Sequence, residues 1–207
     1  MTTIYTIGHS TRGAEDFVRI LNAFGIRQLA DIRTVPRSAR NPQYDQDALK
    51  QFLRNHDIAY VHLKALGGLR RPRKHSPNTG WKNDSFRGYA DYMQTNEFRR
   101  ALAELVAIAG EKTTAIMCAE AVPWRCHRSL VGDALLVRGI EVEDIMSETS
   151  AKPHTLTPWA RADGVRLTYP AETPAHPLES THTEITSHAA PRRTRKTREP
   201  RRQPASG

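Results

Sequence analysis

The chain has 207 residues, of which 38% are hydrophobic, and it carries a formal net charge of +9. This length and apolar content suffice for one sizeable core and favour one domain over two. No apolar stretch is long enough to cross a bilayer, and the opening MTTIYTIGHS lacks the basic and apolar regions of a signal peptide. We therefore expect a cytoplasmic protein without a membrane partner.

Extended apolar runs alternate along the chain with amphipathic stretches that end at glycine. The first run, TIYTI at residues 3–7, is followed by apolar side chains at helical spacing over 17–24 and then by Gly25. The runs RQLADI at 27–32 and IAYVHL at 58–63 each precede another such stretch. This pattern predicts a series of strands, each followed by a helix.

The alternation continues after an unusually long loop at residues 67–85, and loops of this length in compact domains are commonly functional. TTAIMC at 113–118 predicts the next strand, apolar side chains over 130–135 predict a helix, and VEDIM at 142–146 predicts a final strand. Strands separated by helices pair in parallel, with helices on both sheet faces. We therefore predict an α/β fold: a single three-layer domain over 1–160 with a mainly parallel sheet of about five strands.

The composition changes after residue 160. Proline, threonine, histidine and arginine dominate residues 161–207, so we expect this segment to be a disordered basic tail. Residues 191–207 hold seven arginine and lysine residues against a single glutamate. Such a segment attracts polyanions by counterion release, and nucleic acid is the commonest cellular polyanion. A tail that is merely solvated has the same composition.

Ionisable side chains follow the predicted strands at the points where the strands end. The carboxyl ends of parallel strands share one edge of a sheet, and ligands of open parallel sheets bind there. We therefore expect these side chains to lie around one rim. In chain order they are His9, Ser10, Asp31, Arg33, Arg37, Cys118, Glu120, Arg125, Cys126, His127, Arg128 and His154.

Two carboxylates and two histidines in this set are candidates for proton transfer. Asp31 and Glu120 could each act as a general acid, a general base or a group that activates water. Asp31 could equally cap a helix or pair with Arg33. His9 and His127 could position or protonate a substrate, although isolated histidines are usually structural.

The arginines of the set can hold an anion. Arg33, Arg125 and Arg128 make a bidentate clamp for phosphate possible, and Arg37 follows the same strand as Arg33. Ser10 and His154 are further candidates for contacts to substrate. A solvated surface charge is the alternative for any single arginine.

Cys126 lies near a predicted helix start beside His127 and Arg128, an electropositive setting that can lower a thiol pKa. This position favours a nucleophile, although small buried cysteines are common. Cys118 ends an apolar strand, so a packing role is favoured for it. The spacing of the two cysteines matches neither a structural zinc site nor a CxxC redox pair, and no phosphate-binding glycine fingerprint is present. We expect no metal and no cofactor.

The long loop mixes basic side chains, Arg73 among them, with Trp81, and Tyr44 comes from a neighbouring loop. Cations beside flat rings suit a groove that stacks bases and follows phosphates. The alternative is a tryptophan that covers the end of the core.

Several segments of the chain together match one family. They include YTIGHSTR, DIRTVPRSARNPQYD, IMCAEAVPWRCHRSL and EVEDIMSETSAKPHTL. Over about residues 3–158 the chain closely resembles the bacterial and archaeal family known as domain of unknown function 488, and the basic tail lies outside this likeness. The resemblance implies a single α/β domain with characteristic residues that correspond to His9, Ser10, Asp31, Arg33, Cys118, Glu120, Cys126, His127, Arg128 and His154.

Charge and aromatic side chains on one predicted edge favour an enzyme that acts on nucleic acid or a nucleotide. It would hydrolyse a glycosidic or phosphoester bond, as a DNA glycosylase-like repair enzyme does, with a base extruded from the duplex where necessary. One alternative is a non-catalytic module that binds nucleic acid or a modified base. Another is a thiol-dependent enzyme that uses Cys126 as nucleophile and Cys118 as resolving partner.

Overall fold

The computed structural model describes residues 2–171. The expectation of a disordered tail concerns mainly residues 172–207, which lie outside the described residues. Within residues 2–171, no helix combines the length and the apolar character needed to cross a membrane.

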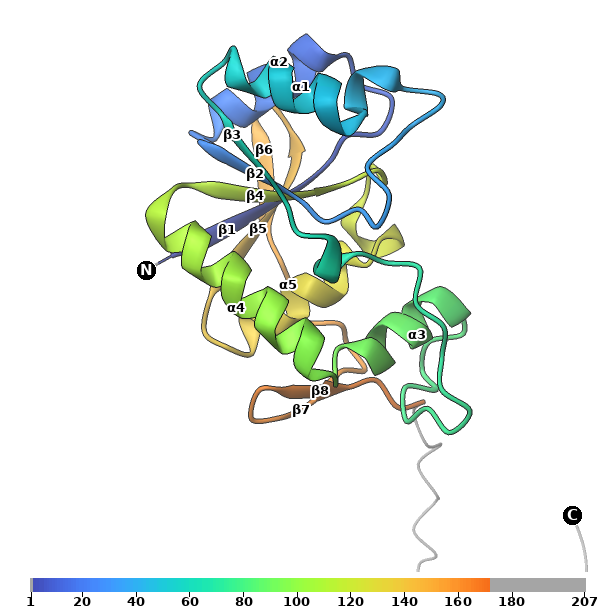
Figure 1. Ribbon diagram of the computed structural model, residues 1–207. Helices are drawn as coiled ribbons and strands as arrows, with labels where there is room; N and C mark the ends of the chain where they lie inside the picture. Colours follow the sequence, from blue (N-terminus) through green and yellow to red (C-terminus); the bar gives the residue numbers. More distant parts are fainter. Residues whose placement is uncertain (1, 172–207) are drawn as a thin grey trace, which may run out of the picture. The chain divides into compact units, whose positions relative to one another are not determined.

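A six-stranded sheet with the order β3-β2-β4-β1-β5-β6 forms the centre of the fold (Figure 1). All neighbouring pairs are parallel except β5 and β6, which are antiparallel. The strands are β1 (Thr3–Gly8), β2 (Gln28–Asp31), β3 (Ala59–His62), β4 (Thr114–Cys118), β5 (Glu141–Ser147) and β6 (Ser150–Pro153). The predicted mainly parallel α/β fold is confirmed.

Helices cover both faces of this sheet, as predicted. In Figure 1, α1 (Ala14–Ala23) and α2 (Gln46–Arg54) lie on one side of the sheet, and α4 (Asn96–Glu111) and α5 (Arg128–Leu136) lie on the other. Alternate residues of β4 pack on opposite faces, because successive side chains of a strand point to opposite sides. Ile116 belongs to the core under α4 and α5, whereas Met117 belongs to the core under α1 and α2.

The strand register aligns the carboxyl ends that carry the candidate site. Gly8 of β1 pairs with Cys118 of β4, and Asp31 of β2 pairs with Met117 of β4 and with His62 of β3. The residues that leave these strands therefore start from one edge of the sheet. This register is strongly specified, because β2 and β4 are buried along their whole length.

The structure adds three elements that the sequence patterns did not predict. The strand β6 makes the sheet one strand larger than expected, and α3 (Asp84–Tyr92) follows the long loop. The side chain of Asn83 caps α3 by accepting hydrogen bonds from the backbone N–H groups of Ser85 and Phe86. β6 contains no apolar run, and the buried residues of α3 are consecutive, from Gly88 to Tyr92, so neither element shows the hydrophobic periodicity of its type.

The third addition is a hairpin that extends the fold past the boundary expected at residue 160. It consists of β7 (Arg161–Asp163) and β8 (Arg166–Thr168), paired in antiparallel fashion. Tyr169, directly after the hairpin, is fully buried, and its hydroxyl donates a hydrogen bond of 2.9 Å to Asp133 Oδ2 in α5. The boundary was placed too early because this segment is mostly polar, and the buried Tyr169 that attaches it to α5 gives no recognisable sequence pattern.

Candidate functional site

A cavity of about 450 Å³ opens at the carboxyl edge of the sheet. Its walls come from the segments that follow β2, β3 and β4 and from the start of α3. We call it the carboxyl-edge cavity; the lining residues that matter here are Arg33, Arg37, Phe86, Cys118, Glu120, Arg125, Cys126 and His127. Seven of the twelve residues predicted for one rim, Cys118 among them, therefore line this cavity. Phe86, which was not predicted, lines it as well.

The end of β1 is packed directly against the loop that follows β4. A Cβ atom at Gly8 would lie 1.7 Å from the carbonyl oxygen of Glu120, so no larger residue fits at this position without a shift of the loop. The backbone N–H groups of His9 and Ser10 donate to the carbonyls of Cys118 and Ala119, at 3.0 and 2.9 Å. These contacts fix the loop that carries Glu120.

Asp31 is fully buried and forms an ion pair with Arg33 at a Nη2 to Oδ2 distance of 2.6 Å. Its Oδ1 accepts from Nε and from the backbone N–H of Arg33, at 2.9 and 3.0 Å. The hydroxyl of Tyr60 donates to Oδ2 at 2.7 Å. Both carboxylate oxygens are therefore occupied, and Asp31 positions Arg33, which lines the cavity while Asp31 does not.

His9 and Tyr44 are packed beneath the cavity. Their rings stack at a centroid distance of 4.0 Å, and both residues are buried. Burial lowers the pKa of His9 to about 4, so its ring is neutral at pH 7. Nδ1–H donates to the carbonyl of Ser10 at 2.8 Å, which leaves Nε2 as an acceptor facing Arg33 Nη1 at 3.5 Å. Tyr44 supports His9 and does not line the cavity.

The sulfur atoms of Cys118 and Cys126 lie next to each other in the cavity wall, with the two Cα atoms 7.5 Å apart. Disulfides usually span Cα distances of about 4.4–6.8 Å, so a bond between the two sulfurs needs a small backbone movement. Cys118, for which packing was the favoured expectation, is therefore the neighbour of the predicted nucleophile. The backbone N–H of Arg128, the first residue of α5, donates to Cys126 Sγ at 3.5 Å. Sequence spacing alone could not show this pairing, because it depends on how the loop between the two cysteines folds.

His127 completes the surroundings of the cysteine pair. Its Nε2–H donates to the carbonyl of Ile32 at 3.1 Å, so Nδ1 carries the lone pair and lies 3.5 Å from Cys126 Sγ. Burial lowers the pKa of His127 to about 4, which keeps the imidazole neutral. The unprotonated Nδ1 can accept a hydrogen bond from the Cys126 thiol when the cysteines are reduced.

Arg128 braces the loop and does not line the cavity. It is 1% exposed, and its Nη2 donates to the carbonyl of Glu120 at 2.7 Å. Burial lowers the pKa of Arg128 to about 10, which leaves the guanidinium charged at neutral pH. Arg37, Arg125 and the Glu120 side chain are exposed at the cavity mouth.

The structure places three predicted substrate-binding residues in other cavities. Trp81 and His154 line a cavity of about 470 Å³, to which Trp124 and Trp159 also contribute. Arg73 lines a cavity of about 380 Å³. Ser10 is half-buried and lines none of these three cavities.

His154 is held between two carboxylates. Its Nδ1 lies 2.9 Å from Asp144 Oδ2, and its Nε2 lies 3.2 Å from Asp133 Oδ1. Burial by itself would lower the pKa of His154, but the hydrogen bonds to Asp133 and Asp144 outweigh it and raise the pKa to about 9. Because both ring nitrogens of the charged His154 are hydrogen-bonded, this residue links α5 and β5 to the segment after β6.

Sequence reasoning missed one side chain that lines the carboxyl-edge cavity and one that holds Asp31. Phe86 belongs to α3, and it offers the cavity a ring within the segment DSFRGYADY, whose helical character was not recognised. Tyr60 looked like an ordinary strand residue, and nothing local indicates its hydrogen bond to Asp31. Within residues 2–171, no group of three or more histidine, cysteine, aspartate or glutamate side chains is placed to hold a metal ion.

Comparisons with known proteins identify the family. No curated protein and no solved structure shows significant similarity to the chain. The model of one family, described as "Domain of unknown function DUF488", matches residues 13–135, which is more than half of the chain. The matched segment carries the buried ion pair and both cysteines. The protein therefore belongs to the DUF488 family.

Proposed function

We propose that the protein is a thiol-dependent redox enzyme that exchanges its disulfide with a small thiol in the carboxyl-edge cavity. The observation that carries this proposal is the adjacent pair Cys118 and Cys126 in the cavity wall, with His127 Nδ1 3.5 Å from Cys126 Sγ. A redox-active pair needs a second sulfur close by, a group that hydrogen-bonds the thiol and access for substrate. The cysteine pair, His127 and the cavity provide them here.

Cys126 is the cysteine that forms the bond to substrate. Its sulfur accepts a hydrogen bond from the backbone N–H of Arg128 at the start of α5, where the helix dipole favours negative charge. Arg125 lines the same cavity and adds positive charge, whereas the charge of Arg33 is balanced by Asp31. The backbone N–H and Arg125 stabilise a Cys126 thiolate relative to the thiol, and water takes up the proton.

The exchange proceeds through two substitutions at sulfur. A substrate thiolate attacks Cys126 Sγ, the bond between the cysteines breaks, and Cys118 leaves as a thiolate that takes up a proton. A second substrate thiolate then attacks the substrate sulfur of the mixed disulfide, and Cys126 leaves as a thiolate. Two thiols become one disulfide and two electrons pass to the protein; one proton ends on Cys118 and the other is released to solvent, while Cys126 remains a thiolate. The reverse order reduces a substrate disulfide.

The cavity favours a small anionic thiol as substrate. Its volume of about 450 Å³ is in the range of small-molecule sites. Asp31 balances the charge of Arg33, and the lining then holds Arg37 and Arg125 against a single carboxylate, Glu120, so the charge of the wall suits a carboxylate or phosphate group. We place the reaction in the cytoplasm, where thiols are kept reduced.

Single cysteine variants test this proposal with glutathione as the probe. In Cys118→Ser, glutathione disulfide should form one mixed disulfide at Cys126, detected by mass spectrometry of the intact protein. In Cys126→Ser this adduct should form at least tenfold more slowly. The pH dependence of alkylation of Cys118→Ser should give a Cys126 pKa about one unit or more below the usual thiol value of about 8.5.

The matched comparison is between the two variants, since each keeps one cysteine in the same cavity. Circular dichroism should show that both remain folded. Equal adduct formation in the two variants, or a Cys126 pKa at the usual thiol value, would contradict the proposal.

We propose hydrolysis of a nucleotide or nucleic acid, including a role in DNA repair, as the second candidate function. The observation in its favour is that Arg33, Arg37 and Arg125 share the cavity with Glu120 and with the ring of Phe86. Phosphate contacts, a stacking surface and a carboxylate base are what such a reaction uses. Because Asp31 is bound to Arg33 and Tyr60, Glu120 alone would carry the base function. Binding of a nucleic acid without turnover would use the same groups.

Glu120→Gln separates the two candidates. If the protein hydrolyses nucleotides or oligonucleotides with modified bases, Glu120→Gln should reduce turnover about 100-fold or more, whereas Cys126→Ser should retain it. Product release is measured by chromatography across a panel of such substrates. Turnover that is lost in Cys126→Ser and kept in Glu120→Gln would contradict hydrolysis by Glu120.

A further inference from the structure

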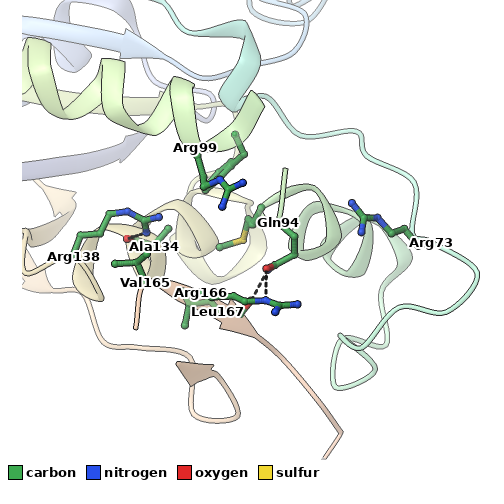
Figure 2. A pocket seen from close by; sticks show the side chains of 10 residues that line it. Arg73, Gln94, Arg99, Ala134, Arg138, Val165, Arg166 and Leu167 are labelled. Atoms are coloured by element: carbon green, nitrogen blue, oxygen red, sulfur yellow. Dashed lines mark hydrogen bonds between the residues drawn. The ribbon is translucent and has the colours of Figure 1, made fainter. Parts of the chain in front are cut away.

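A second cavity with strong positive charge lies away from the candidate site. It has a volume of about 380 Å³, and it shares no lining residue with the carboxyl-edge cavity. We call it the arginine cavity, because its lining includes Arg73, Arg99, Arg138 and Arg166. Figure 2 shows Arg138 on one side and Arg73 on the opposite side, with Arg99 and Arg166 between them.

The four arginines come from four separate segments of the chain. Arg73 belongs to the long loop after β3, Arg99 to α4, Arg138 to the turn after α5, and Arg166 to β8. No aspartate or glutamate lines the cavity. Among residues 2–171, the salt bridges do not include any of the four guanidinium groups. The fold therefore gathers positive charge here without balancing it from the part of the chain that the structure describes.

Neutral acceptors hold three of these side chains in place. Arg138 Nη1 donates to the carbonyl of Ala134 at 2.6 Å, and Arg166 Nε donates to Gln94 Oε1 at 3.1 Å. Arg99 Nη2 donates to the side-chain oxygen of Asn96. A guanidinium group has five N–H donors, so each of these arginines keeps several for a ligand.

The loop that carries Arg73 is anchored as well. The backbone N–H of Arg73 donates to Asp91 Oδ2 at 2.7 Å, and Asp91 is buried in α3. The position of Arg73 at the cavity rim is therefore built into the fold.

The like charges oppose one another. Burial, and then the positive charge of Arg99, lowers the pKa of Arg138. An anion placed between the two guanidinium groups would relieve this repulsion, and it would receive several charge-assisted hydrogen bonds. Apart from Gln94, the remaining lining is apolar and includes Met93, Phe98 and Leu167.

We propose that the arginine cavity binds a small molecule that carries two or more linked phosphate groups. Four guanidinium groups match several phosphate oxygens better than one carboxylate, because their forked donors fit phosphate geometry. The volume is in the range of small-molecule sites, and the apolar lining accommodates the organic part of the ligand. This site goes beyond the proposed function, since it lies outside the carboxyl-edge cavity.

Isothermal titration calorimetry of the full chain with inorganic tripolyphosphate tests the site. We expect saturable binding that weakens as the salt concentration rises. Arg99→Gln and Arg138→Gln should each weaken binding about tenfold or more, since each removes a charged donor group. Arg100→Gln is the matched control: it removes the same charge from the adjacent residue of α4, which is exposed and does not line the cavity.

Thermal unfolding of the three variants shows whether each substitution has weakened the fold. Binding of tripolyphosphate is compared only among variants whose melting temperature matches that of the unchanged protein. If one of the cavity variants melts early, the other alone decides the result. Cys126→Ser should bind tripolyphosphate as the unchanged protein does, so this result is independent of the proposed function.

Two outcomes would overturn the proposal. One is that tripolyphosphate binding weakens equally in Arg99→Gln and Arg100→Gln, which would mean that binding follows net charge, or that it weakens in neither cavity variant, which would place binding in another part of the chain. The other is tight binding of a single-stranded DNA oligonucleotide, lost in Arg99→Gln, without binding of tripolyphosphate. The cavity would then be part of a nucleic-acid surface.

Discussion

Asp31→Asn should lower the free energy of unfolding by about 3–5 kcal/mol, because it leaves the Arg33 guanidinium buried without its counter-charge. The side chains of Asp31 and Arg33 are 0% and 7% exposed, and their Oδ2 and Nη2 atoms lie 2.6 Å apart. The hydroxyl of Tyr60 also loses its charged acceptor. Urea unfolding followed by circular dichroism measures the change.

The exposed pair of Asp16 and Arg19 on α1 provides a matched control. Its side chains are each 57% exposed, and the N to O distance is again 2.6 Å. Asp16→Asn should cost less than about 1 kcal/mol, because water already screens the two charges. Equal costs in the two variants would mean that Asp31 does not stabilise a buried charge.

The free energy of unfolding should be largest near pH 6.5 and should fall on both sides of this value. The decline below pH 6.5 arises because burial lowers the pKa of both His9 and His127 to about 4. The decline above pH 6.5 arises from His154. Burial lowers its pKa, but the hydrogen bonds to Asp133 and Asp144 outweigh this effect and raise the pKa to about 9. The reference pKa of histidine in an unfolded chain is about 6.5.

The sign of each slope follows from which state binds more protons. Between about pH 4 and 6.5 the unfolded chain protonates His9 and His127 while the folded protein does not, so acid favours unfolding. Between about pH 6.5 and 9 the folded protein keeps the His154 proton that the unfolded chain has lost, so stability falls as the pH rises. Each histidine should contribute on the order of 2 kcal/mol across its range.

Urea unfolding at a series of pH values, with and without one substitution, measures these slopes. His154→Gln should remove the decline above pH 6.5 and leave the decline below it. His75→Gln, at an exposed position of the long loop, is the control and should keep both slopes. A decline above pH 6.5 that persists in His154→Gln would show that another group causes it.

The local elements could be predicted from the sequence because their signals lie within one strand or one helix. The apolar run that became β1, the helical spacing that became α1, and Gly25 with its positive φ of 64° after α1 are examples. The parallel sheet followed from the alternation of these elements. The strands β6 and β7 were missed because SAKP and RAD contain no apolar run, unlike β2 and β3, which are equally short but lie within apolar runs.

The sequence by itself determined which side chains leave the carboxyl ends of the strands, because a parallel sheet brings those ends to one edge whatever the loops do. Only the tertiary structure decided what these side chains contact. It bound Asp31 to Arg33, stacked Tyr44 on His9 and brought the sulfurs of Cys118 and Cys126 together. It also enclosed His154 between two carboxylates and gathered four distant arginines around one cavity. These contacts depend on distances of a few ångström between loops, and no local pattern of residues encodes such distances.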